Sequence, residues 1–303
     1  MTDLGTVVAR YEAVTGDELV AFAPEVFDRF FQLEHLLGRD PAARLLAPVL
    51  PAVAATLRLP GPVVGAPAGP VGAGDPRVAF AEQFVVDVSR VSDEQRSALH
   101  ATLGEEAVPF VQALFVTDYT RRVRHVLGRL FPGAALVDPA AGGRDGGELV
   151  ATAFELMPAV VRLPGPDPVL RELVRLRIAT QHNCRQCRSL RTASAVQAAG
   201  GLDFFDGLES YEDRADLSSR DRVALGLVDA VLWQPADVGD DRVAEVRAAF
   251  TPAEATELVL FVLRCAWAKV TVSLGRDAAR VTEGVEMYDV DEATGEVVWL
   301  ERA

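Results

Sequence analysis

The stretch that decides the fold runs from residue 172 to residue 201 and reads ELVRLRIATQHNCRQCRSLRTASAVQAAGG. Apolar residues recur every three or four positions on both sides of the polar break at 181–183, which is the spacing of amphipathic helices. Asn183 is a residue type that often caps a helix, so we expect Cys184 in a first helical turn and Cys187 one turn later. The stretch therefore predicts a helical protein with two cysteines near one helix start.

The rest of the chain has mostly the same helical spacing. Residues 285–290 and 296–300 differ, because they flank a turn at 293–295 and predict a short β-hairpin. Glycine- and proline-rich residues predict loops at 60–76 and 138–147. The pattern indicates an all-α fold with a C-terminal hairpin. Its helices are expected at 18–37, 78–91, 107–130, 147–163, 169–180, 193–199, 220–232, 242–250 and 253–274.

Short segments recur in the same order in the two halves of the chain. The pairs are GDELVA at 16–21 with GGELVA at 146–151, GRDP at 38–41 with GPDP at 165–168, RVA at 77–79 and 222–224, and LGR at 127–129 and 274–276. We interpret them as a degenerate tandem duplication, with one repeat at 1–140 and the other at 141–303. In this register Leu57 and Pro60 stand where the second repeat has Cys184 and Cys187, so the first repeat lacks the cysteines.

The overall charge argues against two classes of partner. The 303 residues carry a formal net charge of −14, with a pI near 4.8, and such a chain is repelled by nucleic acids and anionic membranes. No apolar run has the length of a signal peptide or a membrane span. Three cysteines are too few for a disulfide-stapled secreted protein of this size. We therefore expect a soluble, cytoplasmic protein.

The two neighbouring cysteines have the spacing of a redox pair. A helix start stabilises a thiolate through free N–H groups and the helix dipole. Arg185, Arg188 and Arg191 add positive charge in an acidic chain. The spacing also allows an oxidised sulfur to be resolved by its neighbour as an intramolecular disulfide. In a structure, we expect the Cα atoms of Cys184 and Cys187 to lie roughly 4.4–6.8 Å apart.

Other residues near the pair allow more than one interpretation. Glu172 falls at the margin of an apolar helix face, where partial burial would raise its pKa and make it a better base. It could instead pair with Arg175 at the surface, and His182 could be an exposed loop residue. A metal site would need a second half that the sequence lacks, and Cys265 fits core packing, so no metal is predicted. The sequence is also compatible with a buried cysteine pair that has no redox activity.

The order Glu172, eleven residues, Cys184, two residues, Cys187, followed by an alanine-rich segment ending at Ala199-Gly200-Gly201, resembles the carboxymuconolactone decarboxylase superfamily. The likeness is to its alkylhydroperoxidase D-like branch, which carries the paired cysteines. The resemblance implies an all-helical homo-oligomer that reduces alkyl hydroperoxides and is reset by an external dithiol or lipoyl-type donor. It implies no cofactor.

The resemblance also assigns roles to residues. It makes Cys184 and Cys187 the redox pair and Glu172 the proton-relay glutamate. The family often has a histidine four residues after the second cysteine, where this chain has Arg191. Arginine can stabilise a thiolate but cannot accept its proton near neutral pH, so that task passes to Glu172 or His182. On a continuous helix Arg191 would point along the face of both cysteines.

Two other functions remain open at this stage. One is a lyase of the decarboxylase type, in which polar residues of a helical pocket act on a lactone or related acid and the cysteines are incidental. The other is a non-catalytic helical interaction protein. Activity that survives replacement of both cysteines would favour the lyase, and thiols without any response to peroxide would favour the interaction protein.

Overall fold

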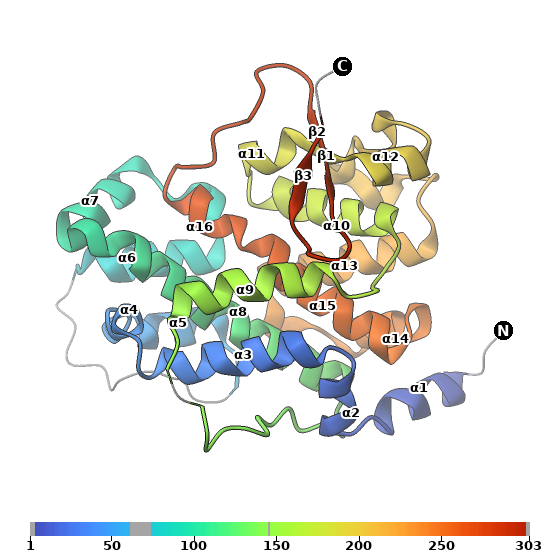
Figure 1. The fold of residues 1–303 in the computed structure, drawn as a ribbon, viewed down its shortest axis with the longest axis horizontal. Helices are drawn as coiled ribbons and strands as arrows, with labels where there is room; N and C mark the ends of the chain where they lie inside the picture. The colour runs from blue at the N-terminus through green and yellow to red at the C-terminus, as the bar shows by residue number, and fades with distance from the viewer. Residues whose placement is uncertain (1–3, 61–73, 145, 301–303) are drawn as a thin grey trace.

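The computed structural model describes residues 4–60, 74–144 and 146–300 and is mostly helical, as predicted (Figure 1). The helices before the middle of the chain are α1 (Leu4–Glu12), α2 (Gly16–Ala21), α3 (Pro24–Leu37), α4 (Pro41–Arg44), α5 (Leu50–Leu57), α6 (Pro76–Val86), α7 (Asp93–Leu103) and α8 (Ala107–Leu130). Those after it are α9 (Leu149–Val161), α10 (Pro168–Gln181), α11 (Arg185–Arg188), α12 (Ala193–Ala199), α13 (Ser219–Trp233), α14 (Asp240–Ala249), α15 (Pro252–Ala266) and α16 (Ala268–Ser273).

Helices α4, α6 and α10 begin with the same local signal, and α4 and α10 illustrate it. Asp40 accepts the backbone N–H of Ala42 at 2.8 Å at the start of α4, and Asp167 accepts that of Leu170 at 3.0 Å at the start of α10. In both cases a proline follows the aspartate, and a first helical turn tolerates proline because its N–H has no helical partner there. The recurring GRDP and GPDP segments thus have the same structural role.

The helices pack around one continuous apolar core. α3 lies along α9, and α8 packs against α15 in the middle of the molecule (Figure 1). The same packing occurs twice, because α5 packs on α6 as α10 packs on α13, and α6 packs on α7 as α13 packs on α14. Likewise, α3 and α7 both contact α8 in the first half, and α9 and α14 both contact α15 in the second half.

A small sheet lies beside the helices, with the strand order β1 (Leu190–Thr192), β2 (Glu286–Val290) and β3 (Val297–Trp299). The predicted hairpin is confirmed, since β2 and β3 are antiparallel and Tyr288 lies opposite Trp299. β1 was not predicted. It pairs parallel to β2, with Arg191 opposite Met287, so the chain between α11 and α12 is extended there. The sheet therefore ties the cysteine segment to the C-terminal tail.

Several predicted boundaries were wrong in detail. The helix expected at 253–274 is interrupted at Trp267, which separates α15 from α16, and the one at 18–37 is divided into α2 and α3. Helices α1, α5 and α7 were not predicted. The predicted loop at 60–76 lies mostly outside the described residues, which resume at 74. Among the described residues, no helix is both long enough and apolar enough to cross a membrane.

Candidate redox site

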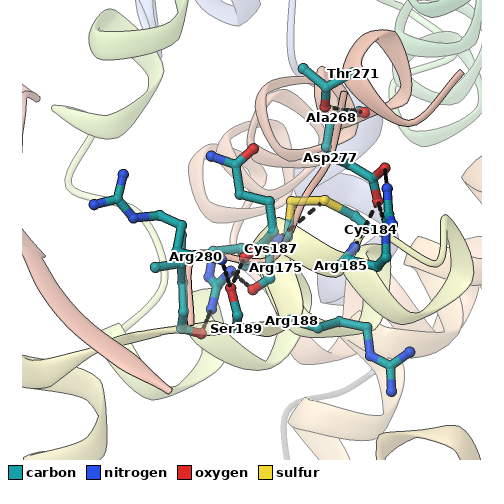
Figure 2. The surroundings of a disulfide bond; sticks show 12 residues. Arg175, Cys184, Arg185, Cys187, Arg188, Ser189, Ala268, Thr271, Asp277 and Arg280 are labelled. Carbon is teal, nitrogen blue, oxygen red and sulfur yellow. Dashed lines mark hydrogen bonds and ion pairs between the residues drawn. A yellow bond between two sulfur atoms is a disulfide. The ribbon is translucent and has the colours of Figure 1, made fainter. Parts of the chain in front are cut away.

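The two cysteines are joined by a disulfide bond at the start of α11 (Figure 2). Their Cα atoms lie 5.3 Å apart, which confirms the predicted range. Cys184 is fully buried, whereas Cys187 is half-buried. Cys187 is therefore the cysteine that an external reagent can reach with the smaller rearrangement.

The turn before the disulfide differs from the expected one. Asn183 adopts a left-handed conformation with φ of 51°, which asparagine tolerates better than most residues. The backbone N–H of Cys184 then donates to the carbonyl oxygen of Ala179 at 2.9 Å. Cys184, and not Asn183, is the capping residue of α11, because its Sγ accepts the backbone N–H of Cys187 at 3.2 Å.

Asp277 occupies the start of α11, although it is 92 residues away from Arg185 in the sequence. Its carboxylate accepts the backbone N–H of Arg185 at 2.9 Å and forms an ion pair with the Arg185 side chain at 2.8 Å (Figure 2). Its carbonyl oxygen accepts the N–H of Gln186 at 2.9 Å. Burial raises the pKa of Asp277, but the bonds from Arg185 outweigh it and the pKa is lowered. A carboxylate charge thus already sits where the sequence predicted stabilisation of a thiolate.

Glu172 is buried in a fully paired position. Its carboxylate accepts two bonds from Arg175, at 2.6 and 2.8 Å, and two from the Thr192 hydroxyl and N–H, at 2.8 and 3.2 Å. Burial pushes the pKa of Glu172 upward, but the charge of Arg175 and these hydrogen bonds pull it down further, so the net shift is downward. The predicted rise in pKa is wrong. The pairing with Arg175 occurs, but in the interior and not at the surface.

Arg175 connects this carboxylate to the cysteine segment. Its guanidinium donates to the carbonyl oxygens of Cys187 at 2.9 Å and Leu190 at 2.7 Å. Glu172 fixes the guanidinium, and the guanidinium fixes the backbone on both sides of Ser189. The ion pair therefore holds the end of α11 and the start of β1 in place.

His182 is buried rather than exposed, so its interpretation as a surface loop residue was wrong. It lies at a very small void lined in part by Asp87, Trp233 and Lys269, and its Nδ1 has no hydrogen-bond partner among the described residues. Burial, followed by the charges of Lys269 and Arg122, lowers the pKa of His182 well below its usual value. The imidazole is therefore neutral at physiological pH.

Arg191 does not follow the cysteines on a continuous helix, so that expectation was wrong. Helix α11 ends at Arg188, and Arg191 lies in β1. Its guanidinium donates to the carbonyl oxygens of Arg188 at 2.8 Å and Leu190 at 2.9 Å, and it approaches Asp206 to 3.9 Å. Together with Arg185 and Arg188 it lines a hollow of about 370 Å³ beside α11. Its partners are backbone carbonyls and an exposed carboxylate.

The third cysteine lies outside the disulfide pair. Cys265 is buried in α15, and burial raises the pKa of its thiol, as core packing predicts. Within the described ranges, no three histidine, cysteine or acidic side chains are grouped so that they could hold a metal ion. The sequence missed Asp277, Thr192 and Ser189 as neighbours of the site. Ser189 accepts the N–H of Arg280 through its Oγ at 3.0 Å.

Comparisons with known proteins identify relatives but no activity. Two uncharacterized proteins of Mycobacterium tuberculosis, from the strains CDC 1551 / Oshkosh and ATCC 25618 / H37Rv, are each 43% identical to this chain over 215 residues. The aligned part covers 70% of this chain and 76% of each relative. No protein-family model and no solved structure matches the chain. The extent and identity of the alignments show that the chain belongs to the same family as these two mycobacterial proteins.

Proposed function

We propose that the protein is a thiol-dependent peroxidase of the alkylhydroperoxidase D-like type that works through Cys184 and Cys187. The observation that carries this proposal is the disulfide between them, which joins a fully buried residue, Cys184, to a half-buried one, Cys187. Such a pair can alternate between dithiol and disulfide without large movement of the chain, because the Cα atoms are already 5.3 Å apart.

The proposed reaction consumes one hydroperoxide and one dithiol donor per cycle. The thiolate of one cysteine attacks the terminal peroxide oxygen, the O–O bond breaks, and the alkoxide takes up a proton to leave as an alcohol. The resulting sulfenic acid condenses with the partner thiol, which forms the disulfide and releases water. An external dithiol then attacks the disulfide, forms a mixed disulfide and leaves oxidised, so that both protein thiols are regenerated. Cys187 is the proposed point of attack by the donor.

In this proposal Glu172 and Arg175 are positioning residues. Their ion pair fixes the carbonyl oxygens of Cys187 and Leu190, and the lowered pKa of Glu172 makes it a poor proton acceptor. The half-buried Cys187 can release its proton to water. Arg191 supplies positive charge near α11 but has no part in proton transfer.

We also propose that the chain arose by duplication of one helical unit, with only the second copy keeping cysteines. The twofold recurrence of helix packing, with α5 and α6 matching α10 and α13, supports this proposal. In this register the end of α5 at Leu57 takes the place of the cysteine turn.

The proposal is tested by the consumption of an alkyl hydroperoxide in the presence of dihydrolipoamide. Cys184→Ser and Cys187→Ser should each reduce the rate to that of the donor and peroxide alone. Cys265→Ala is the matched control, because it removes the remaining cysteine outside the pair, and it should retain the wild-type rate. A wild-type protein that consumes no peroxide, or a double serine variant that still does, would overturn the proposal.

One observation favours the non-catalytic alternative. Glu172, to which the resemblance assigns the proton relay, is held in an ion pair with Arg175. Arg191 is bound to backbone carbonyls and faces Asp206. Under this alternative the disulfide is a structural staple of the turn between α10 and β1. Peroxide consumption, together with thermal unfolding of the oxidised and reduced protein, separates the two functions. If the disulfide is only structural, its reduction lowers the thermal stability and the protein consumes no peroxide.

A further inference from the structure

A cleft of about 430 Å³ is lined in part by Glu172 and Arg175. It is bounded by the loop between α9 and α10, by α10 and α15, and by β2. Its walls include the apolar side chains Leu163, Phe261 and Tyr288 together with the guanidinium groups of Arg171 and Arg264. This volume is in the range of pockets that hold small organic molecules.

The two arginines converge on one aromatic ring. The guanidinium carbons of Arg171 and Arg264 lie 5.8 and 5.9 Å from the centroid of Phe261. Neither has a carboxylate within 4.0 Å among the residues that the structure describes. Burial lowers the pKa of Arg171, the charge of Glu257 raises it, and the charge of Arg264 lowers it again. Two like charges held together in this way are stabilised by an anion between them.

Arg171 is held in place by hydrogen bonds to neutral groups. It donates to the carbonyl oxygens of Val161, at 3.1 Å, and Leu163, and its Nε is buried with no partner in the described part of the chain. Gly165, with φ of 42°, makes room for the guanidinium, since a Cβ there would lie 2.3 Å from Nη2 of Arg171. The loop therefore fixes Arg171 through neutral carbonyl groups, and Glu257 acts on its charge without forming an ion pair with it among the described residues.

The other charged side chains of the cleft are already engaged, with one exception. Glu172 pairs with Arg175, Arg162 pairs with Glu25, Asp167 caps α10, and Asp289 accepts two bonds from Ser194. The exception is Glu292, which is exposed at the rim. Arg171 and Arg264 are therefore the cations of the cleft lining that form no ion pair with a described residue, whereas the carboxylates of Asp167 and Asp289 are held by neutral donors.

We propose that this cleft binds a small organic acid, with its carboxylate between Arg171 and Arg264 and its apolar body against Phe261 and Leu163. An arginine fork suits a carboxylate, and the aromatic wall favours an acid with a hydrocarbon or aromatic body over an inorganic anion. The proposal concerns binding alone. It does not depend on the disulfide chemistry, because none of the groups that carry it is a cysteine.

The test is isothermal titration calorimetry with hexanoate and benzoate as probes. Benzyl alcohol serves as the neutral match for benzoate, and inorganic phosphate as an anion without an apolar body. We expect saturable binding of the two acids and weaker binding of the alcohol and of phosphate. Arg264→Gln should weaken acid binding at least about tenfold, the effect of losing one charge-assisted hydrogen bond. Arg171→Gln should act in the same direction.

Arg242→Gln is the matched control, because it removes an arginine charge that pairs with Glu245 at the surface of α14. It should leave the affinity unchanged, and circular dichroism of each variant confirms that the fold is kept. Absence of saturable binding of either acid to the wild type would overturn the proposal. So would equal affinity for benzoate and benzyl alcohol, or wild-type affinity in both Arg264→Gln and Arg171→Gln.

Discussion

Two clusters in the described part of the chain, one around Asp118 and one around Glu172, each hold a buried arginine by a buried carboxylate, and they differ in what surrounds them. In the first, Asp118 binds Arg122 at 2.6 Å and Lys269 at 2.9 Å, and Arg122 donates to the carbonyl oxygens of Val231 and Leu232. In the second, Glu172 binds Arg175, which donates to the carbonyl oxygens of the cysteine segment. Both clusters use an arginine to fix backbone segments that are distant in sequence.

The difference lies in charge balance and access. The Asp118 cluster carries two cations for one carboxylate and is sealed in the core, where burial lowers the pKa of Lys269 to about 8. The Glu172 cluster is neutral, borders a cleft and contacts the turn that bears the disulfide. In both clusters the buried acid next to an arginine is therefore a structural group. The Glu172 cluster differs only in its surroundings, which are the cleft and the turn that bears the disulfide.

The largest expected effect is in the sealed cluster. Asp118→Ala leaves Arg122 and Lys269 buried without a counter-charge, so we expect it to lower the free energy of unfolding by about 3–5 kcal/mol in urea titrations. Asp93→Ala is the matched control. Asp93 binds Arg96 at the same distance of 2.6 Å but is 92% exposed, so its removal should cost about 1 kcal/mol or less. Equal losses in the two variants would contradict the comparison.

A smaller effect is expected at Glu172, where an amide can keep some of the hydrogen bonds. Glu172→Gln should lower the free energy of unfolding at neutral pH by about 2–3 kcal/mol, since Arg175 loses its charge partner. The pH dependence gives a second signature. The pKa of Glu172 is lower in the folded state, so its contribution is present above the unfolded value near ~4.3 and is lost as the pH falls through the folded value.

The variant should therefore show a flatter loss of stability in acid than the wild type. Glu155→Gln removes an exposed carboxylate that pairs with Arg29 at 3.1 Å, and it should follow the wild-type curve at all pH values. Parallel acid curves for the wild type and Glu172→Gln would show that Glu172 is not stabilised in its charged form. The proton-relay interpretation of the sequence would then regain its basis.

Regular patterns in the sequence predicted several elements closely. Helix α8 occupies the predicted residues 107–130, α12 occupies 193–199, and the C-terminal hairpin forms where its turn residues are. These elements follow from local spacing and turn chemistry, which a single sequence contains. The distance between the Cα atoms of Cys184 and Cys187 also follows from the sequence, because two residues three positions apart in one turn have little freedom to separate.

The surroundings of the pair could not be predicted in the same way. Asp277 reaches the start of α11 from the loop after α16, and β1 forms because β2 returns from the C-terminal tail to pair with Leu190 and Arg191. Both contacts bridge about 90 or more residues, and no periodic pattern encodes them. The environment of Glu172 was misjudged for a related reason. A helical projection shows burial, but it does not show that Thr192 and Arg175 satisfy the carboxylate.

The smallest expected effect concerns a third carboxylate–arginine pair, Asp277 with Arg185, which is open to solvent on the arginine side. The carboxylate of Asp277 occupies the helix start beside Cys184, where a thiolate would compete with it for the same positive end (Figure 2). Asp277→Asn should therefore lower the pKa of the reduced Cys184 thiol, by about one unit or less. The measurement is the ultraviolet absorbance of the thiolate against pH, in a Cys187→Ser, Cys265→Ala background.

The matched control for this shift is Asp206→Asn. Asp206 faces Arg191 at 3.9 Å and is 73% exposed, so its charge is screened by solvent and should not move the thiol pKa. If Asp206→Asn shifts the pKa and Asp277→Asn does not, Arg191 and not the start of α11 controls the sulfur. The reverse result places control of the sulfur with Asp277. In that case Arg191 affects the charge of the hollow beside α11 and leaves the thiol itself unaffected.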